Sequence, residues 1–136
     1  MTTAEYEKHA WACEQIRSQN EQLLDDFTRW LVERGSGGRS SIPQHVQRVG
    51  LYINTYLLFD DAVPARRGAD RVGFFLGYWY AHHVRQWRPD SLRRYVGSLK
   101  KFYTFLRERG EISVPEWQEL EETVRRAVAA EPNDAP

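Results

Sequence analysis

The sequence predicts an all-α fold, a compact bundle of four to five helices, on three observations. Apolar residues recur at helical spacing through most of the chain, strand-like alternation is almost absent, and Gly, Pro and capping-type residues separate the helical stretches. The chain has 136 residues, of which 41% are hydrophobic, and a domain of this length buries roughly two-thirds of its unfolded surface. We therefore expect one helical domain over residues 1–130 and a disordered tail over residues 131–136.

The first two helices are marked by their ends. Residues 4–34 have apolar positions close to heptad spacing, although the polar stretch 17–22 could divide them into two helices, and Gly35 is a suitable stop. A second helix is predicted from Ser41, because Ser41 and Gln44 have the spacing of a capping box. Residues 60–70 (DDAVPARRGAD) have the composition of a linker.

The third helix is predicted over residues 70–87, with Asp70 as its N-cap. Its sequence is apolar and aromatic nearly all round, which predicts a central, buried helix.

The fourth helix has the clearest periodicity. Apolar residues in SLRRYVGSLKKFYTFLRERG (residues 91–110) repeat at 3.6-residue spacing, and Gly110 provides a stop. A last helix is predicted from Ser113, because Ser113 and Glu116 again have capping-box spacing.

Positive charge is concentrated in one part of a chain whose formal net charge is zero. Counting Lys and Arg minus Asp and Glu, residues 71–110 give 9 − 2 = +7 and residues 111–136 give 2 − 7 = −5. A neutral total therefore does not exclude an anionic partner. The alternative is that acidic helices cover a basic one.

The polar side of the fourth helix carries cations without acids, since residues 91–107 contain no Asp or Glu. Its members are Arg93, Arg94, Gly97, Lys100, Lys101, Thr104 and Arg107. Glycine inside a helix costs about 1 kcal/mol relative to alanine, so close approach of a ligand at Gly97 is one explanation and close packing of another helix is the other. Several cations on one rigid surface with a low centre suit a phosphate backbone.

Catalytic and metal-binding patterns are weak. His9 and Cys13 could face one metal but are too few, and a core-facing Cys13 beside a partly exposed His9 is the simpler interpretation. His82 and His83 are adjacent in sequence and so point about 100° apart. No paired carboxylates, phosphate-binding loop or nucleophile elbow is present.

Targeting signals are also absent from the sequence. It has no apolar run of 18 residues and no signal-peptide pattern, so we expect no membrane association. The single Cys13 cannot form an internal disulfide, which favours a cytoplasmic setting.

Three segments together resemble the N-terminal core-binding domain, also called the SAM-like domain, of tyrosine recombinases and phage integrases. They are LLDDFTRWLVERG (23–35), HVQRVGLYINTYL (45–57) and SLRRYVGSLKKFYTFLRERGEIS (91–113), and the resemblance covers roughly residues 20–128. It implies a helical module that holds one side of double-stranded DNA. The predicted DNA-binding residues are Arg39, His45, Gln47, Arg48, Arg93, Arg94, Gly97, Lys100, Lys101 and Arg107.

The family's catalytic domain has no counterpart in this sequence. His82-x-x-Arg85 has the residues and spacing of that domain's His-x-x-Arg box. It lies inside the binding module, so we interpret the match as a coincidence. We expect a non-enzymatic DNA-binding module for DNA integration or recombination, without cofactor or metal. Whether it is a stand-alone module, a recombinase remnant or one domain stays open, with Met1 and the acidic tail favouring a short complete protein. If the five cations of the fourth helix each contact one phosphate, the logarithm of the DNA association constant should fall with the logarithm of the salt concentration with a slope of roughly −4 to −5.

The main alternative is a protein-interaction or oligomerisation module. In it the basic helix docks on an acidic surface, such as residues 111–136 of another copy, and Trp11, Trp30 or Trp87 serve as anchors. The partners expected beside DNA are therefore a recombinase or a second copy of the chain. An enzyme is the third and weakest interpretation.

Overall fold

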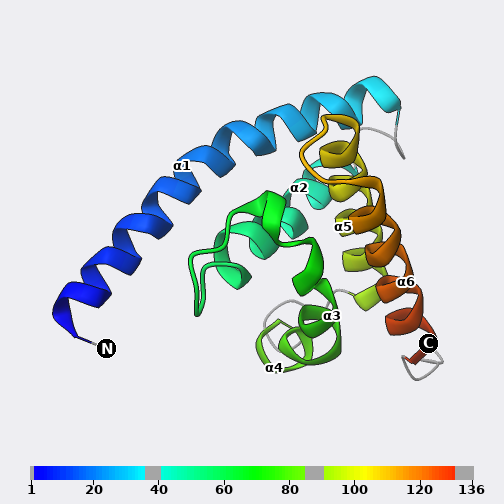
Figure 1. The fold of residues 1–136 in the computed structure, drawn as a ribbon. Helices are drawn as coiled ribbons and strands as arrows, with labels where there is room; N and C mark the ends of the chain where they lie inside the picture. The colour runs from blue at the N-terminus through cyan, green and yellow to red at the C-terminus, as the bar shows by residue number, and fades with distance from the viewer. Residues whose placement is uncertain (1, 36–40, 85–90, 131–136) are drawn as a thin grey trace. The chain divides into compact units, whose positions relative to one another are not determined.

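Helices make up all the regular structure of the described chain. A computed structural model describes residues 2–35, 41–84 and 91–130, and every regular element in these ranges is a helix or a helical turn (Figure 1). The predicted all-α class is confirmed. Internal contacts divide the chain into two units, residues 1–68 and 69–136, with the boundary inside the predicted linker. The single domain expected over residues 1–130 stays a prediction.

The first unit begins with α1 (Thr3–Arg34), one uninterrupted helix of 32 residues. Thr2 and Glu5 form a reciprocal capping box, in which the Glu5 amide donates to Thr2 Oγ1 over 3.1 Å. The helix ends at Gly35, whose φ of 64° lies in the left-handed region. The stop at Gly35 is confirmed, and the suggested division at residues 17–22 does not occur.

The polar stretch 17–22 contacts another segment of the same unit instead of breaking α1. Asn20 is 2% exposed, and its Nδ2 donates to the Ile53 carbonyl over 3.2 Å and to Asn54 Oδ1 over 2.9 Å. Arg17 Nε donates to the Asn54 carbonyl over 3.4 Å. These polar side chains are therefore interhelical contacts, which explains why they are compatible with a continuous helix.

The second helical run is α2 (Ile42–Leu51) followed by the π-helical turn η1 (Tyr52–Tyr56). The predicted capping box at Ser41 is wrong, because Ser41 has helical backbone angles (φ −88°, ψ −16°) and makes no side-chain capping bond. A short 3₁₀ turn, η2 (Ala65–Arg67), follows in the linker. The Tyr52 hydroxyl donates to the Gly68 carbonyl over 2.7 Å, which ties this linker to the second run.

The second unit opens with the 3₁₀ turn η3 (Ala69–Arg71), and a continuous helical stretch follows over residues 72–83. This stretch consists of α3 (Val72–Phe74), the π-helical turn η4 (Phe75–Trp79) and α4 (Tyr80–His83). The helix predicted over residues 70–87 is therefore present from Val72 to His83 with a π-helical turn inside it, and residues 85–87 lie outside the described residues. Asp70 lies within η3 and is not an N-cap. The expectation of burial all round is also wrong, because Phe74 is 58% exposed and Tyr78 is 49% exposed.

The unit continues with α5 (Leu92–Glu108) and α6 (Val114–Ala130), which pack side by side (Figure 1). Ser91 caps α5 by accepting the Arg94 amide over 3.2 Å, and Gly110, with φ 76°, follows the end of the helix. The capping box predicted at the start of α6 is present in both directions, since Ser113 and Glu116 each accept the other's amide. All the apolar residues predicted for the fourth helix are buried: Leu92, Tyr95, Val96, Leu99, Phe102, Tyr103, Phe105 and Leu106.

Candidate nucleic-acid interface

The polar side of α5 is divided in two by the position of α6. Trp117 of α6 donates from Nε1 to Thr104 Oγ1 over 3.1 Å, and the Arg107 guanidinium lies 4.1 Å from the centre of the Trp117 ring. Thr104 Oγ1 itself donates to the Lys100 carbonyl over 2.7 Å. Thr104 therefore joins two helices and does not lie on the open side of α5.

Further along the same seam, Lys100 lines a groove together with residues of α6. The structure therefore gives Lys100 and Arg107, two of the predicted DNA-binding residues, neighbours on α6 within their own unit. Because Lys100 and Arg107 lie beside α6, we leave them out of the candidate interface.

Three residues remain on the open side of α5, and we call Arg94, Gly97 and Lys101 the α5 strip. At 100° per residue they fall within a sector of about 60°. A Cβ atom placed on Gly97 would meet nothing within 4 Å, so the centre of the strip is open. Arg94 is exposed and Lys101 is half-buried. Of the two explanations for Gly97, close helix packing is not observed, and access to the backbone remains.

Arg93 adjoins this strip in the first turn of α5 and is exposed. The segment without acidic residues ends at Arg107, and the next residue is Glu108. Glu108 follows Lys101 by seven residues and therefore lies on the same side of the helix. The strip and Arg93 together therefore present three cations, and the Glu108 carboxylate limits this surface at the C-terminal end of the helix.

The predicted residues of the first unit form a separate group on α2. Gln47 is exposed, His45 is half-buried and Arg48 is only 8% exposed. A buried guanidinium is poorly placed to reach a phosphate, so we also leave Arg48 out. Arg39 lies outside the described residues.

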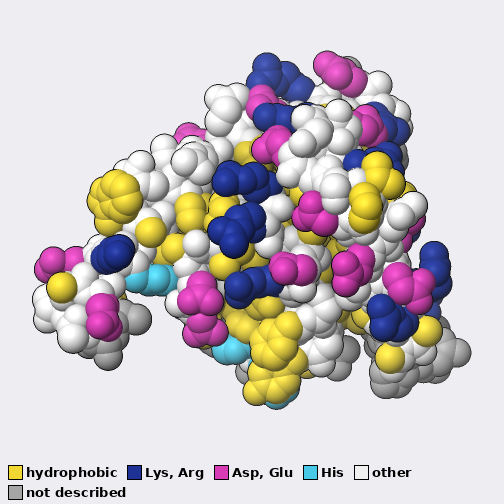
Figure 2. Space-filling view, in the orientation of Figure 1, with side chains coloured by type: hydrophobic (Ala, Val, Ile, Leu, Met, Phe, Trp, Pro, Cys, Tyr) yellow, Lys and Arg dark blue, Asp and Glu magenta, His cyan; other side chains and the backbone are white. Residues whose placement is uncertain are grey.

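The acids of α6 do not neutralise α5 through direct ion pairs within the described part of the second unit. Glu122 pairs within its own helix, with Arg125 at 2.6 Å and Arg126 at 3.8 Å, and Glu116 serves the capping box. Acidic and basic side chains lie next to one another over α6 (Figure 2). At the turn, Arg109 pairs with Glu111 at 2.9 Å. This pair lies between the two helices, and of the acids of α6 Glu121 lies beside a cation of α5, Lys100, without an ion pair to it in the described residues.

An exposed stack of aromatic rings, which the sequence interpretation missed, lies on the turns before α5. Tyr78 lies between Phe74, at a ring-centre distance of 5.2 Å, and His82, at 4.0 Å. His82 Nδ1 is 2.8 Å from the Tyr78 carbonyl oxygen. We call these three residues the aromatic column, and a hydrophobic patch is visible over α3 and α4 in Figure 2. The spacing of four residues between Phe74, Tyr78 and His82 could have indicated this stack from the sequence. The neighbouring residues are also apolar or aromatic, so the sequence did not distinguish these three as an exposed group.

The other chemical candidates do not assemble into a site. Cys13 is 4% exposed and its Sγ lies 3.4 Å from His9 Nε2, as expected for a core-facing thiol beside a partly exposed histidine. Within residues 2–35, 41–84 and 91–130, no three His, Cys, Asp or Glu side chains are grouped to hold a metal ion. Arg85 of the His-x-x-Arg match, and Trp87, lie outside these ranges.

Comparison with known proteins gives no relative: no family model, no curated protein and no solved structure matches the chain. The resemblance to a core-binding domain therefore stays an expectation from the sequence. None of the helices in the described ranges is long and apolar enough to cross a membrane.

Proposed function

We propose that this chain is a non-catalytic, DNA-binding helical module that contacts the phosphate backbone of double-stranded DNA through the α5 strip and Arg93. The observation that carries the proposal is the open glycine between two cations on one rigid helix. Lys and Arg side chains supply affinity for phosphates, and a small residue between them allows the backbones to approach.

The resemblance to recombinase core-binding domains supports the same proposal and adds a setting, DNA integration or recombination. In such enzymes the cutting and joining groups lie in another domain, so this chain would position DNA for a separate catalytic partner. A cytoplasmic setting is part of the proposal and is supported by the free, buried Cys13.

The test is the fluorescence anisotropy of labelled duplex DNA, measured over a series of salt concentrations. Three phosphate contacts predict a slope of log K on log salt of about −3, shallower than the −4 to −5 expected from the sequence. The double variant Arg94→Glu/Lys101→Glu removes two contacts, so its slope should fall to about −1.

The matched control is Arg29→Glu/Arg126→Glu. Both arginines are exposed and pair within their own helices, with Asp26 and Glu122. Each pair of substitutions changes the net charge by 2 × (−2) = −4 from zero, so a general charge effect would weaken both variants equally. Binding that is absent at low salt, or that the strip variant retains in full, contradicts the proposal.

Docking of a partner protein is a second candidate function, favoured by the aromatic column. Large exposed aromatic side chains in a contiguous group are typical of protein-binding surfaces. Light scattering after size exclusion should then show self-association that Phe74→Ala/Tyr78→Ala abolishes. The control Tyr6→Ala/Trp11→Ala removes two aromatics of similar exposure, 64% and 63%, from α1. A monomer at all concentrations would contradict self-association through the column.

A further inference from the structure

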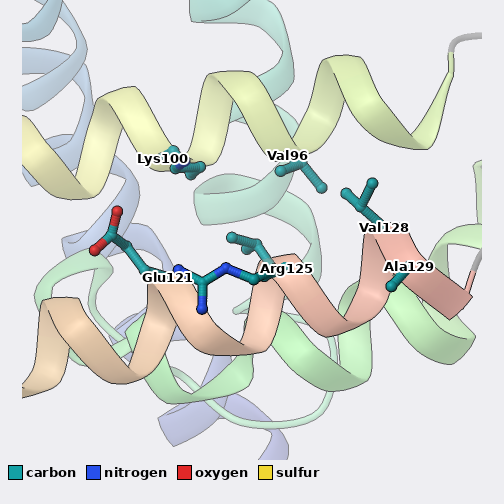
Figure 3. Close-up of a pocket in the computed structure, with 7 residues that line it drawn as sticks. Val96, Lys100, Glu121, Arg125, Val128 and Ala129 are labelled. Carbon is teal, nitrogen blue, oxygen red and sulfur yellow. The ribbon is translucent and has the colours of Figure 1, made fainter.

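A groove runs along the seam of α5 and α6 (Figure 3). Its volume is about 390 Å³, and residues of both helices line it: Val96, Lys100, Glu121, Val124, Arg125 and Val128. This volume lies in the range of about 300–1,000 Å³ that is typical of small-molecule sites. The groove belongs wholly to the second unit.

The two ends of the groove differ in chemistry. Val96 and Val128 point toward one another at one end, and Val124, which is 3% exposed, adds to the apolar wall. Lys100, Glu121 and Arg125 lie at the other end, where the Glu121 side chain extends from α6 toward α5 (Figure 3). A ligand that fills the groove therefore needs an apolar part and a charged part.

The charged end contains both signs. Lys100 and Glu121 are half-buried, and no ion pair joins them to each other or to another side chain in the described ranges. Half-buried charges lose part of their hydration, and a counter-charge restores stabilisation. Arg125 pairs with Glu122 through Nη1 at 2.6 Å, and a guanidinium has five N–H donors, so it keeps donors for a further acceptor.

We propose that this groove binds a free α-amino acid with an apolar side chain. The ligand carboxylate accepts hydrogen bonds from Lys100 and Arg125, and its ammonium group donates to Glu121. Its side chain packs on Val96, Val124 and Val128. A simple carboxylate would leave Glu121 without a counter-charge, and an aliphatic amine would leave Lys100 without one, whereas a zwitterion satisfies both. The proposal does not depend on DNA binding.

Ligand chemistry provides the first test. The full chain, labelled with ¹⁵N, is titrated with L-leucine and followed by amide NMR shifts, which should saturate and be largest for residues that line the groove. Three comparison compounds each lack one part: 4-methylpentanoate lacks the ammonium group, 3-methylbutylamine lacks the carboxylate, and glycine lacks the apolar side chain. Each should bind about tenfold more weakly or worse. Equal affinity for leucine and its analogues, or no saturable shift, overturns the proposal.

Substitutions in the chain provide the second test. Lys100→Gln and Glu121→Gln should each weaken leucine binding by about tenfold. Glu119→Gln is the matched control, because Glu119 is an exposed acid of α6 that does not line the groove. Far-UV circular dichroism checks that the variants remain folded. Leucine binding that both groove variants retain at the affinity of the control overturns the assignment.

Discussion

Arg94 and Arg107 show how neighbours decide the role of a residue on α5. Both are basic and lie on the polar side of the same helix, so periodicity assigns them to one surface. Arg107 stacks on Trp117 at 4.1 Å, whereas Arg94 lies with Gly97 on the open side. A cation over an aromatic ring contributes to packing. Loss of Arg107 should therefore affect stability, and loss of Arg94 should affect DNA binding.

Gly97 provides a direct test of the open strip. Gly97→Ala should raise the free energy of unfolding by about 0.5–1 kcal/mol, since alanine is the better helix former and its Cβ would meet nothing within 4 Å. Gly97→Trp should instead obstruct the approach of DNA and weaken binding in the anisotropy assay. Gly77→Ala is the control, because its Cβ is also uncontacted and it lies outside α5. Unchanged DNA affinity in Gly97→Trp would exclude the strip as the contact surface.

Tyr103 predicts a pH dependence of stability. Burial, and then the Asp70 carboxylate, raise the pKa of its hydroxyl well above the usual value of about 10. Because the folded pKa lies above the unfolded one, this stabilisation is fully present below about pH 10 and is lost as the pH rises toward the folded pKa. The free energy of unfolding should fall there by up to about 1.4 kcal/mol per pH unit from this group.

Urea denaturation of wild type and Tyr103→Phe across about pH 9–11 measures that contribution. The phenylalanine variant lacks the titrating group, so its stability should depend less steeply on pH in this window. Tyr6→Phe, at an exposed position, is the control and should keep the wild-type slope. Parallel curves for wild type and Tyr103→Phe would rule out this source of alkaline destabilisation.

At the scale of elements, the sequence predicts α5 and α6 well and the turns before them poorly. The apolar stripe of α5 and the capping box at Ser113 are local patterns, and local hydrogen bonds and burial satisfy them. The turns of residues 69–83 carry aromatics on every side, so periodicity cannot indicate which face is buried. The exposure of Phe74 depends on tertiary packing that no local pattern encodes. The candidate site also depends on tertiary packing. Lys100 and Lys101 are adjacent in sequence, and only the position of α6 assigns Lys100 to the groove and Lys101 to the α5 strip.

Ser41 and Ser113 extend this comparison to helix starts. Both precede a residue of capping type at the right spacing, but only Ser113 forms the box. The helical backbone angles of Ser41 prevent the usual geometry, in which an extended N-cap directs its hydroxyl at the third amide. Spacing alone therefore identifies a helix start without fixing its hydrogen bonds.

Removal of the α6 capping box should be measurable. Ser113→Ala loses the hydroxyl that accepts the Glu116 amide over 3.2 Å, so the free energy of unfolding should fall by about 0.5–2 kcal/mol. Ser18→Ala, at an exposed position inside α1, is a control that should change stability little. Chemical denaturation followed by circular dichroism gives both values. A loss at Ser113 no larger than that at Ser18 would show that the box contributes nothing to stability.

At the scale of the whole molecule, positive and negative charges are separated within the second unit and not between the two units. Residues 1–68 carry 8 − 9 = −1 and residues 69–136 carry 11 − 10 = +1. Neither unit is strongly basic, so any affinity for DNA must come from a local surface and not from net charge. The steep charge contrast of the sequence, +7 over residues 71–110 and −5 over residues 111–136, lies within the second unit.

The division into units predicts that substitutions in different units act independently. Asn20→Leu removes two hydrogen bonds of a buried amide in the first unit and should cost about 1–3 kcal/mol, because the groups it served lose a donor. Ser113→Ala acts on the α6 cap, which belongs to the second unit. The double variant should therefore lose the sum of the two single effects within about 0.5 kcal/mol. Urea denaturation of the wild type, the two single variants and the double variant measures these free energies. A difference of more than about 1 kcal/mol between the double variant and the sum of the single variants would show that the two sites are energetically coupled.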